Sequence, residues 1–207
     1  MKKGYTDIVM VVDRSGSMAS CKSDMEWALI NYVDELKKED GDFKLSYYIF
    51  DTVLESKFVE KPIKDIGELK IEPRGLTALY DAMGAVINFT GARLASKHES
   101  DRPERVLFVV ITDGLENSSK EYGANQISEM VKHQTDKYNW GFVYLGANQD
   151  AIAVGGSIGI SLGNSMTYNT SERGLMNTSM GLYNYTHRYA QVGATSFTDE
   201  ERSEAVE

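Results

Sequence analysis

The sequence of 207 residues has a single cysteine and no long apolar run. The lone Cys21 excludes an internal disulfide and a cysteine-rich zinc site, and it fits a reducing compartment. No stretch approaches the roughly 18 consecutive apolar residues that a membrane helix needs. The first apolar run, 8–12, stops at Asp13, which is too early for the core of a secretory signal peptide. We therefore expect a cytoplasmic protein without a membrane partner.

Positive charge is also scarce. Lys and Arg total 22 and Asp and Glu total 31, which gives a formal net charge of −9. An acidic chain repels phosphate groups, so a nucleic-acid partner is disfavoured. Apolar residues make up 42% of the chain, which is typical of a soluble protein with a buried core.

The sequence alternates between strand-like and helix-like segments. Apolar runs predict strands, and the two residues 51 and 52 are a link so short that the strands on either side form a hairpin. The predicted strands are 8–12, 43–50, 53–59, 105–112, 142–145 and 166–168. Apolar residues spaced three and four apart predict the helices 20–38, 77–97, 121–138, 149–158 and 171–192. Residues 61–74 have no clean period and are predicted to form a loop.

Strands that take turns with helices imply crossover connections and a mostly parallel sheet. The predicted fold is one doubly wound α/β domain over residues 1–192, with a mostly parallel six-stranded sheet, one antiparallel edge strand and helices on both faces. Residues 193–207 are predicted to form a polar, flexible tail.

Polar residues follow the predicted strand ends at three places. Asp13, Ser15 and Ser17 follow the first strand in the pattern D-x-S-x-S, Thr77 opens a long helix, and Asp113 ends the most apolar strand. In open α/β sheets, ligands bind at the carboxyl ends of the strands, near the point where the strand order reverses. Two carboxylates and three hydroxyls, with no His or Cys, are hard oxygen ligands that suit Mg²⁺, Mn²⁺ or Ca²⁺. The sequence therefore predicts one divalent-metal site.

Each motif also has an ordinary structural explanation. Loops at strand ends favour Asp, Ser and Gly, Thr77 could cap a helix, and Asp113 could belong to a turn. All three at the correct strand ends favour the metal site. A Mg²⁺ ion with few direct carboxylates keeps bound waters, so it can accept a further carboxylate from another molecule.

These residues resemble the metal-ion-dependent adhesion site (MIDAS) of the von Willebrand factor type A (vWA) family, and the order of elements over roughly residues 5–192 is similar too. The resemblance implies that Ser15 and Ser17 bind the metal directly and that Asp13 often does so through water. It also implies that Thr77 and Asp113 exchange direct and water-mediated roles as the site opens and closes. Four phrases are similar to small stand-alone bacterial and phage vWA proteins: 12–18, 73–79, 112–117 and 145–150.

A rim for a protein partner is predicted around the metal. Its residues are Arg14, Leu76, Leu115, Glu116 and Asn117. The two leucines stand where these relatives are expected to carry smaller or polar residues, so the partner surface here is more apolar if they line the rim. A solvated loop is the alternative for Glu116 and Asn117.

Four further polar residues have mainly structural interpretations. A role in the tight turn is predicted for Asp51, whereas Arg74 either counters charge near the site or pins its loop to the sheet. Asn148 and Asp150 follow a strand at the same edge, and both suit capping of the next helix.

Three functions remain open. The favoured one is a binding module in which Mg²⁺ captures an Asp or Glu of a partner protein. The second is a metal-dependent hydrolase or phosphotransferase with Asp13 as nucleophile. Ser15 stands where such enzymes usually carry a second acidic residue, and no phosphate-binding phrase or nucleophile–His pair is found, so we expect no enzyme. The third is a structural or assembly subunit in which the metal only stabilises the loop.

Overall fold

The computed structural model describes residues 1–147 and 149–207. It contains a six-stranded sheet in the order β3-β2-β1-β4-β5-β6. The strands are β1 (Lys2–Asp13), β2 (Asp42–Phe50), β3 (Leu54–Pro62), β4 (Pro103–Thr112), β5 (Gly141–Ala147) and β6 (Ser165–Tyr168). β3 pairs antiparallel to β2 at one edge, and every other neighbouring pair is parallel. The predicted sheet architecture is confirmed.

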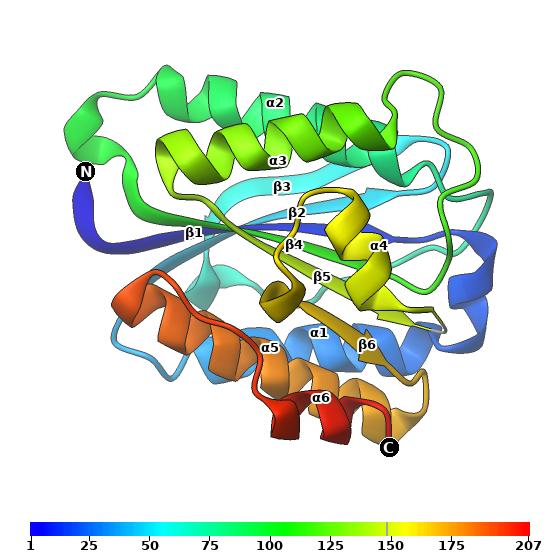
Figure 1. The fold of residues 1–207 in the computed structure, drawn as a ribbon. Helices are drawn as coiled ribbons and strands as arrows, with labels where there is room; N and C mark the ends of the chain where they lie inside the picture. The colour runs from blue at the N-terminus through cyan, green and yellow to red at the C-terminus, as the bar shows by residue number, and fades with distance from the viewer. Residues whose placement is uncertain (148) are drawn as a thin grey trace.

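Helices cover both faces of the sheet (Figure 1). One face carries α2 (Leu79–Ala95), α3 (Ala124–Tyr138) and α4 (Ala151–Ser157). The other face carries α1 (Lys22–Leu36), α5 (Glu172–Val192) and α6 (Asp199–Ala205). Short 3₁₀ turns occur at η1 (Gly16–Ser20), η2 (Ile63–Asp65), η3 (Glu99–Asp101) and η4 (Leu162–Asn164). None of the helices in the described ranges combines the length and the hydropathy that crossing a bilayer requires.

The apolar run of β1 divides between two cores. Ile8, Met10 and Val12 pack on the side of α1 and α5, whereas Val9 and Val11 pack on the side of α2 and α3. All five side chains are fully buried, because a parallel strand at the centre of this sheet has helices on both faces. Continuous hydrophobicity is therefore what this strand requires.

The predicted loop over 61–74 contributes to the core. Apart from η2 it is irregular after the end of β3, yet Ile63, Ile66, Leu69 and Ile71 are almost completely buried against the α1 face. Their spacing follows neither the helical nor the strand period, because an irregular backbone presents its side chains at irregular intervals. Periodicity alone misses such packing.

The segment 193–207, predicted to form a polar, flexible tail, contains a packed helix in the structure. The segment forms α6 and packs against α5 and β6, with Phe197 and Ala205 buried. Thr198 begins the helix with a capping box, in which its hydroxyl accepts from the backbone of Glu201 at 3.1 Å. The Glu201 carboxylate also accepts from Arg188 of α5 at 2.8 Å. Two apolar anchors and one cap order a segment whose composition is otherwise polar.

Replacing Thr198 with alanine tests whether α6 contributes to stability. The variant loses the hydroxyl that satisfies an N-terminal amide of α6, so we expect the free energy of unfolding to fall by about 1 kcal/mol. Chemical denaturation of the full chain measures the change, and Ser196→Ala, at an exposed serine beside the cap, is the control. Equal stabilities for both variants would restore the flexible tail.

Candidate metal centre

The strand order reverses between β1 and β4. The chain passes from β1 to β2 on one side, and β4, β5 and β6 follow on the other side. The carboxyl ends of β1 and β4 are therefore adjacent, at the position where open α/β sheets bind ligands.

Asp13 fixes the loop after β1. Its side chain is fully buried, and its Oδ1 accepts a hydrogen bond from the Ser15 amide at 2.6 Å. Its Oδ2 accepts from the Thr112 hydroxyl at the end of β4, also at 2.6 Å. These bonds turn the loop back over the strand ends, so that the Ser15 and Ser17 hydroxyl oxygens lie 3.0 Å apart.

The other predicted ligands meet the same loop. The Ser17 hydroxyl donates to Asp113 Oδ1 at 2.6 Å. A Cβ built on Gly114 would lie 3.1 Å from Thr77 Oγ1, 3.6 Å from Ser17 Oγ and 3.8 Å from Asp13 Oδ2. Oxygens from three chain segments thus surround the space beside this glycine. The structure brings all five predicted ligands into one cluster.

Thr77 does not cap its helix. α2 begins at Leu79, after the N-cap position Ala78, and no side chain of the cap residue is bonded there. Instead the loop after β4 binds the helix start, with the Glu116 carboxylate accepting from the Tyr80 amide at 3.1 Å. The Thr77 hydroxyl is therefore not used as a cap and faces the cluster.

Glu116 and Asn117, both predicted for the rim, are engaged with backbone groups. Glu116 also accepts from the amides of Ser118 and Ser119, at 2.8 and 2.7 Å. Asn117 Oδ1 accepts from the Thr77 amide at 3.0 Å, and the Asn117 amide donates to the Thr77 carbonyl at 3.0 Å. These contacts hold the loop after β4 against the segment that carries Thr77.

Burial makes the two carboxylates hard to ionise. It raises the pKa of Asp13 to about 6, although hydrogen bonds from Thr112 and Ser15 act in the opposite direction. Burial also raises the pKa of Asp113, against the hydrogen bond from Ser17. A cation beside them would offset this desolvation, because it stabilises the charged form of each group.

The donor set fits a hard divalent cation. Within residues 1–147 and 149–207, no group of three or more His, Cys, Asp or Glu side chains is arranged to hold a metal. A cation at this cluster would take hydroxyl oxygens together with the two carboxylates. Neighbouring ligands of an octahedral ion with bonds of about 2.1 Å lie about 3.0 Å apart. The Ser15 and Ser17 oxygens have this separation.

Arg14 does not lie on the rim. Its side chain is fully buried, with Nε 3.0 Å from Asp51 Oδ2 and Nη1 2.8 Å from Glu55 Oε2. The reason is the alternation of the D-x-S-x-S loop: Asp13 and Ser15 face the cluster, so the residue between them points away. The pattern indicates this direction of the Arg14 side chain, but not its burial.

Asp51 connects three loops of the centre, which the sequence analysis missed. It accepts from the Val53 amide at 2.7 Å, in the predicted turn role, and it pairs with Arg14. Arg74 Nε lies 2.7 Å from the same Oδ2, so Arg74 pins its loop to the sheet. Asp13 is opposite Phe50 in the parallel register, which places residues 14 and 51 side by side, and the sequence alone does not define this register.

The loop after β5 is described in part. Asn148 lies outside the described residues. Asp150 caps α4 as predicted, with its carboxylate accepting from the Ala153 amide at 3.0 Å. Gln149 Nε2 donates to the Gly114 carbonyl at 3.3 Å, so this loop reaches the glycine beside the cluster.

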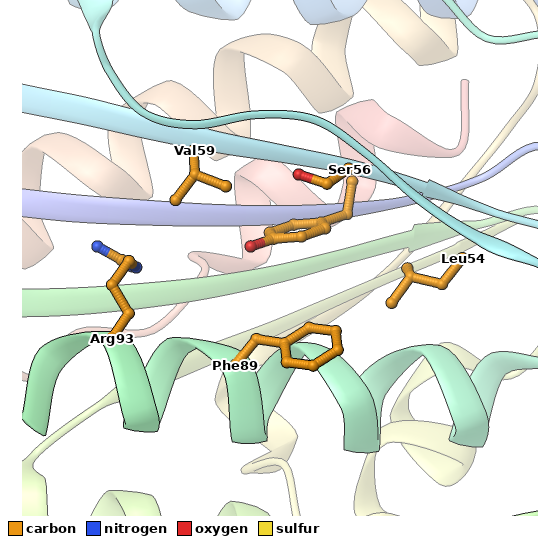
Figure 2. Close-up of a pocket in the computed structure, with 6 residues that line it drawn as sticks. Leu54, Ser56, Val59, Phe89 and Arg93 are labelled. Atoms are coloured by element: carbon orange, nitrogen blue, oxygen red, sulfur yellow. The ribbon is translucent and has the colours of Figure 1, made fainter. Parts of the chain in front are cut away.

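A groove of about 400 Å³ lies elsewhere, between β3 and α2. Figure 2 shows Phe89 and Arg93 projecting from the helix toward Leu54, Ser56 and Val59. Arg93 is held at 2.6 Å from Asp7 and 2.8 Å from Glu60, so its charge is neutralised within the protein. None of the predicted metal ligands lines this groove.

No protein-family model matches the sequence, and no curated protein gives a significant match. Solved structures do resemble the fold. Proximal thread matrix protein 1 from the mussel byssus is 16% identical, with a TM-score of 0.61 over 90% of this chain and 47% of that one. The ArnB paralog VWA2 from Sulfolobus acidocaldarius is 20% identical, with a TM-score of 0.57 over 88% and 45%. A von Willebrand factor type A protein from Catenulispora acidiphila is 12% identical, with a TM-score of 0.57 over 89% and 43%.

A further structure of the mussel protein has a zinc-occupied MIDAS motif and a TM-score of 0.56, at 16% identity over 91% of this chain and 44% of that one. This chain spans less than half the length of each of these proteins. At such identities the likeness shows the fold, which is that of a von Willebrand factor type A domain.

Proposed function

We propose that this chain, which has the vWA fold, is a metal-dependent protein-binding module. A Mg²⁺ ion is held by the five oxygen ligands Asp13, Ser15, Ser17, Thr77 and Asp113, and it captures an Asp or Glu side chain of a partner protein. The observation that carries the proposal is the convergence of these oxygens beside Gly114.

The ligand chemistry favours Mg²⁺, with Mn²⁺ and Ca²⁺ as alternatives. Hydroxyl and carboxylate oxygens suit these hard ions, whereas zinc prefers nitrogen and sulfur ligands. The zinc in the mussel protein supports a divalent ion at this position of the fold. Such an ion, when bound, supplies a Lewis-acidic position for an oxygen of another molecule. Ser17 is solvent-exposed, so the cluster is open to a partner.

Two features favour capture over catalysis. Both carboxylate oxygens of Asp13 accept hydrogen bonds, which lowers its availability as a nucleophile. In the described part of the chain, the hydrogen-bond partners of the cluster are Asp, Ser and Thr side chains and backbone groups, so neither a His nor a Lys is bonded to it as a general base. The acidic net charge favours a protein partner over nucleic acid, and the unpaired Cys21 supports a cytoplasmic location.

Calorimetric titration of chelator-treated protein tests the metal centre. We expect saturable Mg²⁺ binding in the unchanged protein and its loss in Asp113→Ala, because the variant removes one of two carboxylates that neutralise the ion. Asp136→Ala on α3 is the control, since this Asp is exposed and outside the cluster. Mg²⁺ binding that survives in Asp113→Ala would contradict the proposed ligands.

Capture from a cell extract, with and without chelator, then tests the function. A partner released by chelator supports the binding module. Metal-dependent turnover of a phosphate ester would favour the hydrolase. A metal that raises stability without any chelator-sensitive partner would favour the structural role.

A further inference from the structure

We propose that the partner presents a single Asp or Glu between apolar side chains, and that those side chains contact Leu76 and Leu115. The proposal rests on the proposed function, because the carboxylate is the group that the metal captures. The proposal specifies the residues next to that carboxylate in the partner, and it excludes a run of acidic residues as the favoured partner.

The two leucines border the same ligand. Leu76 directly precedes Thr77, and Leu115 directly follows Gly114. Thr77 Oγ1 would lie 3.1 Å from a Cβ on Gly114, so the two chain segments run side by side at this point. Each of these two segments therefore carries an exposed leucine next in sequence to Thr77 or Gly114.

Both leucines are held outward on a fixed backbone. Their exposed fractions are 56% for Leu76 and 60% for Leu115. Gly75 has a φ of 68°, a left-handed conformation that L residues rarely adopt, and it separates the exposed Leu76 from Arg74, which is bonded to Asp51. On the other segment, Asn117 is bonded to Thr77 in both directions. The apolar area of both side chains is therefore available to a partner.

The charge of this protein favours a partner with one carboxylate over a partner with several. The protein has a formal net charge of −9, so it repels a strongly acidic segment. Arg14 is fully buried, and Arg74 is paired with Asp51. Neither arginine is available to attract a second carboxylate, so the metal supplies the main attraction for one. The two exposed leucines add apolar contact area next to it.

Short fluorescent peptides in excess Mg²⁺ test this specificity by anisotropy. One peptide has a central Asp between leucines, a second has the Asp between serines, a third is an Asp run, and a fourth has Asn in place of Asp between leucines. The protein variants are Leu76→Ser/Leu115→Ser and the control Leu162→Ser. Leu162 is 62% exposed and lies in η4, just before the amino end of β6, away from the metal centre.

We expect the leucine-flanked Asp to bind at least about tenfold more tightly than the serine-flanked Asp, because apolar area is buried against each leucine. The double variant should lose this preference while its Mg²⁺ affinity, measured by calorimetry, stays unchanged. The control Leu162→Ser should keep both the preference for the leucine-flanked peptide and the Mg²⁺ affinity. The Asn peptide should not bind.

The opposite results are distinguishable. Equal binding of the two Asp peptides, tighter binding of the Asp run, or a preference that survives in the double variant would overturn this proposal alone. Mg²⁺ binding without any Asp-dependent peptide binding would overturn this proposal and carboxylate capture together. Absence of Mg²⁺ binding would overturn the metal centre itself.

Discussion

Arg14→Met is expected to lower the free energy of unfolding by about 3 kcal/mol, whereas Arg74→Met is expected to lower it by less than about 1 kcal/mol. Both guanidinium groups approach the same oxygen, Asp51 Oδ2, at 3.0 Å and 2.7 Å. Distance alone would make Arg74→Met the more destabilising variant. Because Arg14 is buried and Arg74 is not, we expect Arg14→Met to cost more stability.

The two ion pairs differ in their contact with water. Arg14 is 0% exposed and Asp51 is 2% exposed, whereas the Arg74 side chain is 58% exposed. Removing one member of a buried pair leaves its partner charged and poorly solvated, which costs about 3–5 kcal/mol. We expect the lower end for Arg14→Met, because Arg74 and the Val53 amide still contact Asp51 and because methionine retains much of the buried volume.

Double-mutant cycles measured by chemical denaturation separate the two pairs. The cycle of Arg14→Met with Asp51→Asn should give a coupling energy of about 2 kcal/mol or more, and the cycle of Arg74→Met with Asp51→Asn should give less than about 1 kcal/mol. Equal coupling energies would contradict the role of burial. A variant that fails to fold would itself show a large loss of stability, since the expected loss is a sizeable part of the stability of an ordinary domain.

The sequence predicted most of the sheet because its strands have a strong local signal. β1 and β4 are apolar on both faces, as the continuous runs 8–12 and 106–111 indicate, and helices cover both sides. The five metal-centre residues were also predictable, because the carboxyl ends of parallel strands meet at one edge. The structure places them together without testing what they bind.

The remaining features depend on contacts between segments that are distant in sequence. A charged residue in a loop is exposed by default, so the burial of Arg14 and Asp51 follows only when β1 and β2 are in register. α6 buries Phe197 and Ala205 within a polar segment, too few apolar residues to produce a periodic pattern. Both features arise from tertiary packing that overrides local composition.

In the absence of metal, the free energy of unfolding is expected to fall as the pH rises from about 4 to about 7. Burial raises the pKa of Asp13 to about 6, above the usual value of about 3.9 for an unfolded chain. The folded state therefore holds more protons than the unfolded state in this window, so stability is lost as the pH increases through it. A shift of this size corresponds to about 3 kcal/mol.

Other carboxyls also affect how the free energy of unfolding depends on pH, but it still falls as the pH rises from about 4 to about 7. Burial also raises the pKa of Asp7 to about 6, which adds a fall of the same direction in the same window. Hydrogen bonds from Lys97 and Tyr5, with the charge of Arg93, outweigh burial and lower the pKa of Glu60 to about 2, so Glu60 contributes below about pH 4.5. The variant Asp13→Asn removes the Asp13 contribution and retains that of Asp7.

Mg²⁺ should counteract the Asp13 contribution and leave that of Asp7. At pH 7 the ion binds the ionised carboxylates, and at a concentration of 100 times its dissociation constant it adds about 2.7 kcal/mol to the free energy of unfolding. At pH 5 protons compete for Asp13, so the same concentration should add much less. Asp7 lies beside Arg93, outside the cluster, so its share of the pH dependence should persist with metal.

Chemical denaturation at pH 5 and pH 7, with chelator and with Mg²⁺, measures these contributions in the full chain. The unchanged protein should show a stabilisation by Mg²⁺ that is larger at pH 7, and Asp13→Asn should show little stabilisation at either pH together with a shallower fall in chelator. Equal stabilisation at both pH values would mean that the ion binds without competing for the Asp13 proton, which would remove Asp13 from the ligand set. A steep fall that persists in Asp13→Asn would assign the pH dependence to the other carboxyls whose pKa is raised by burial, Asp7 and Asp113.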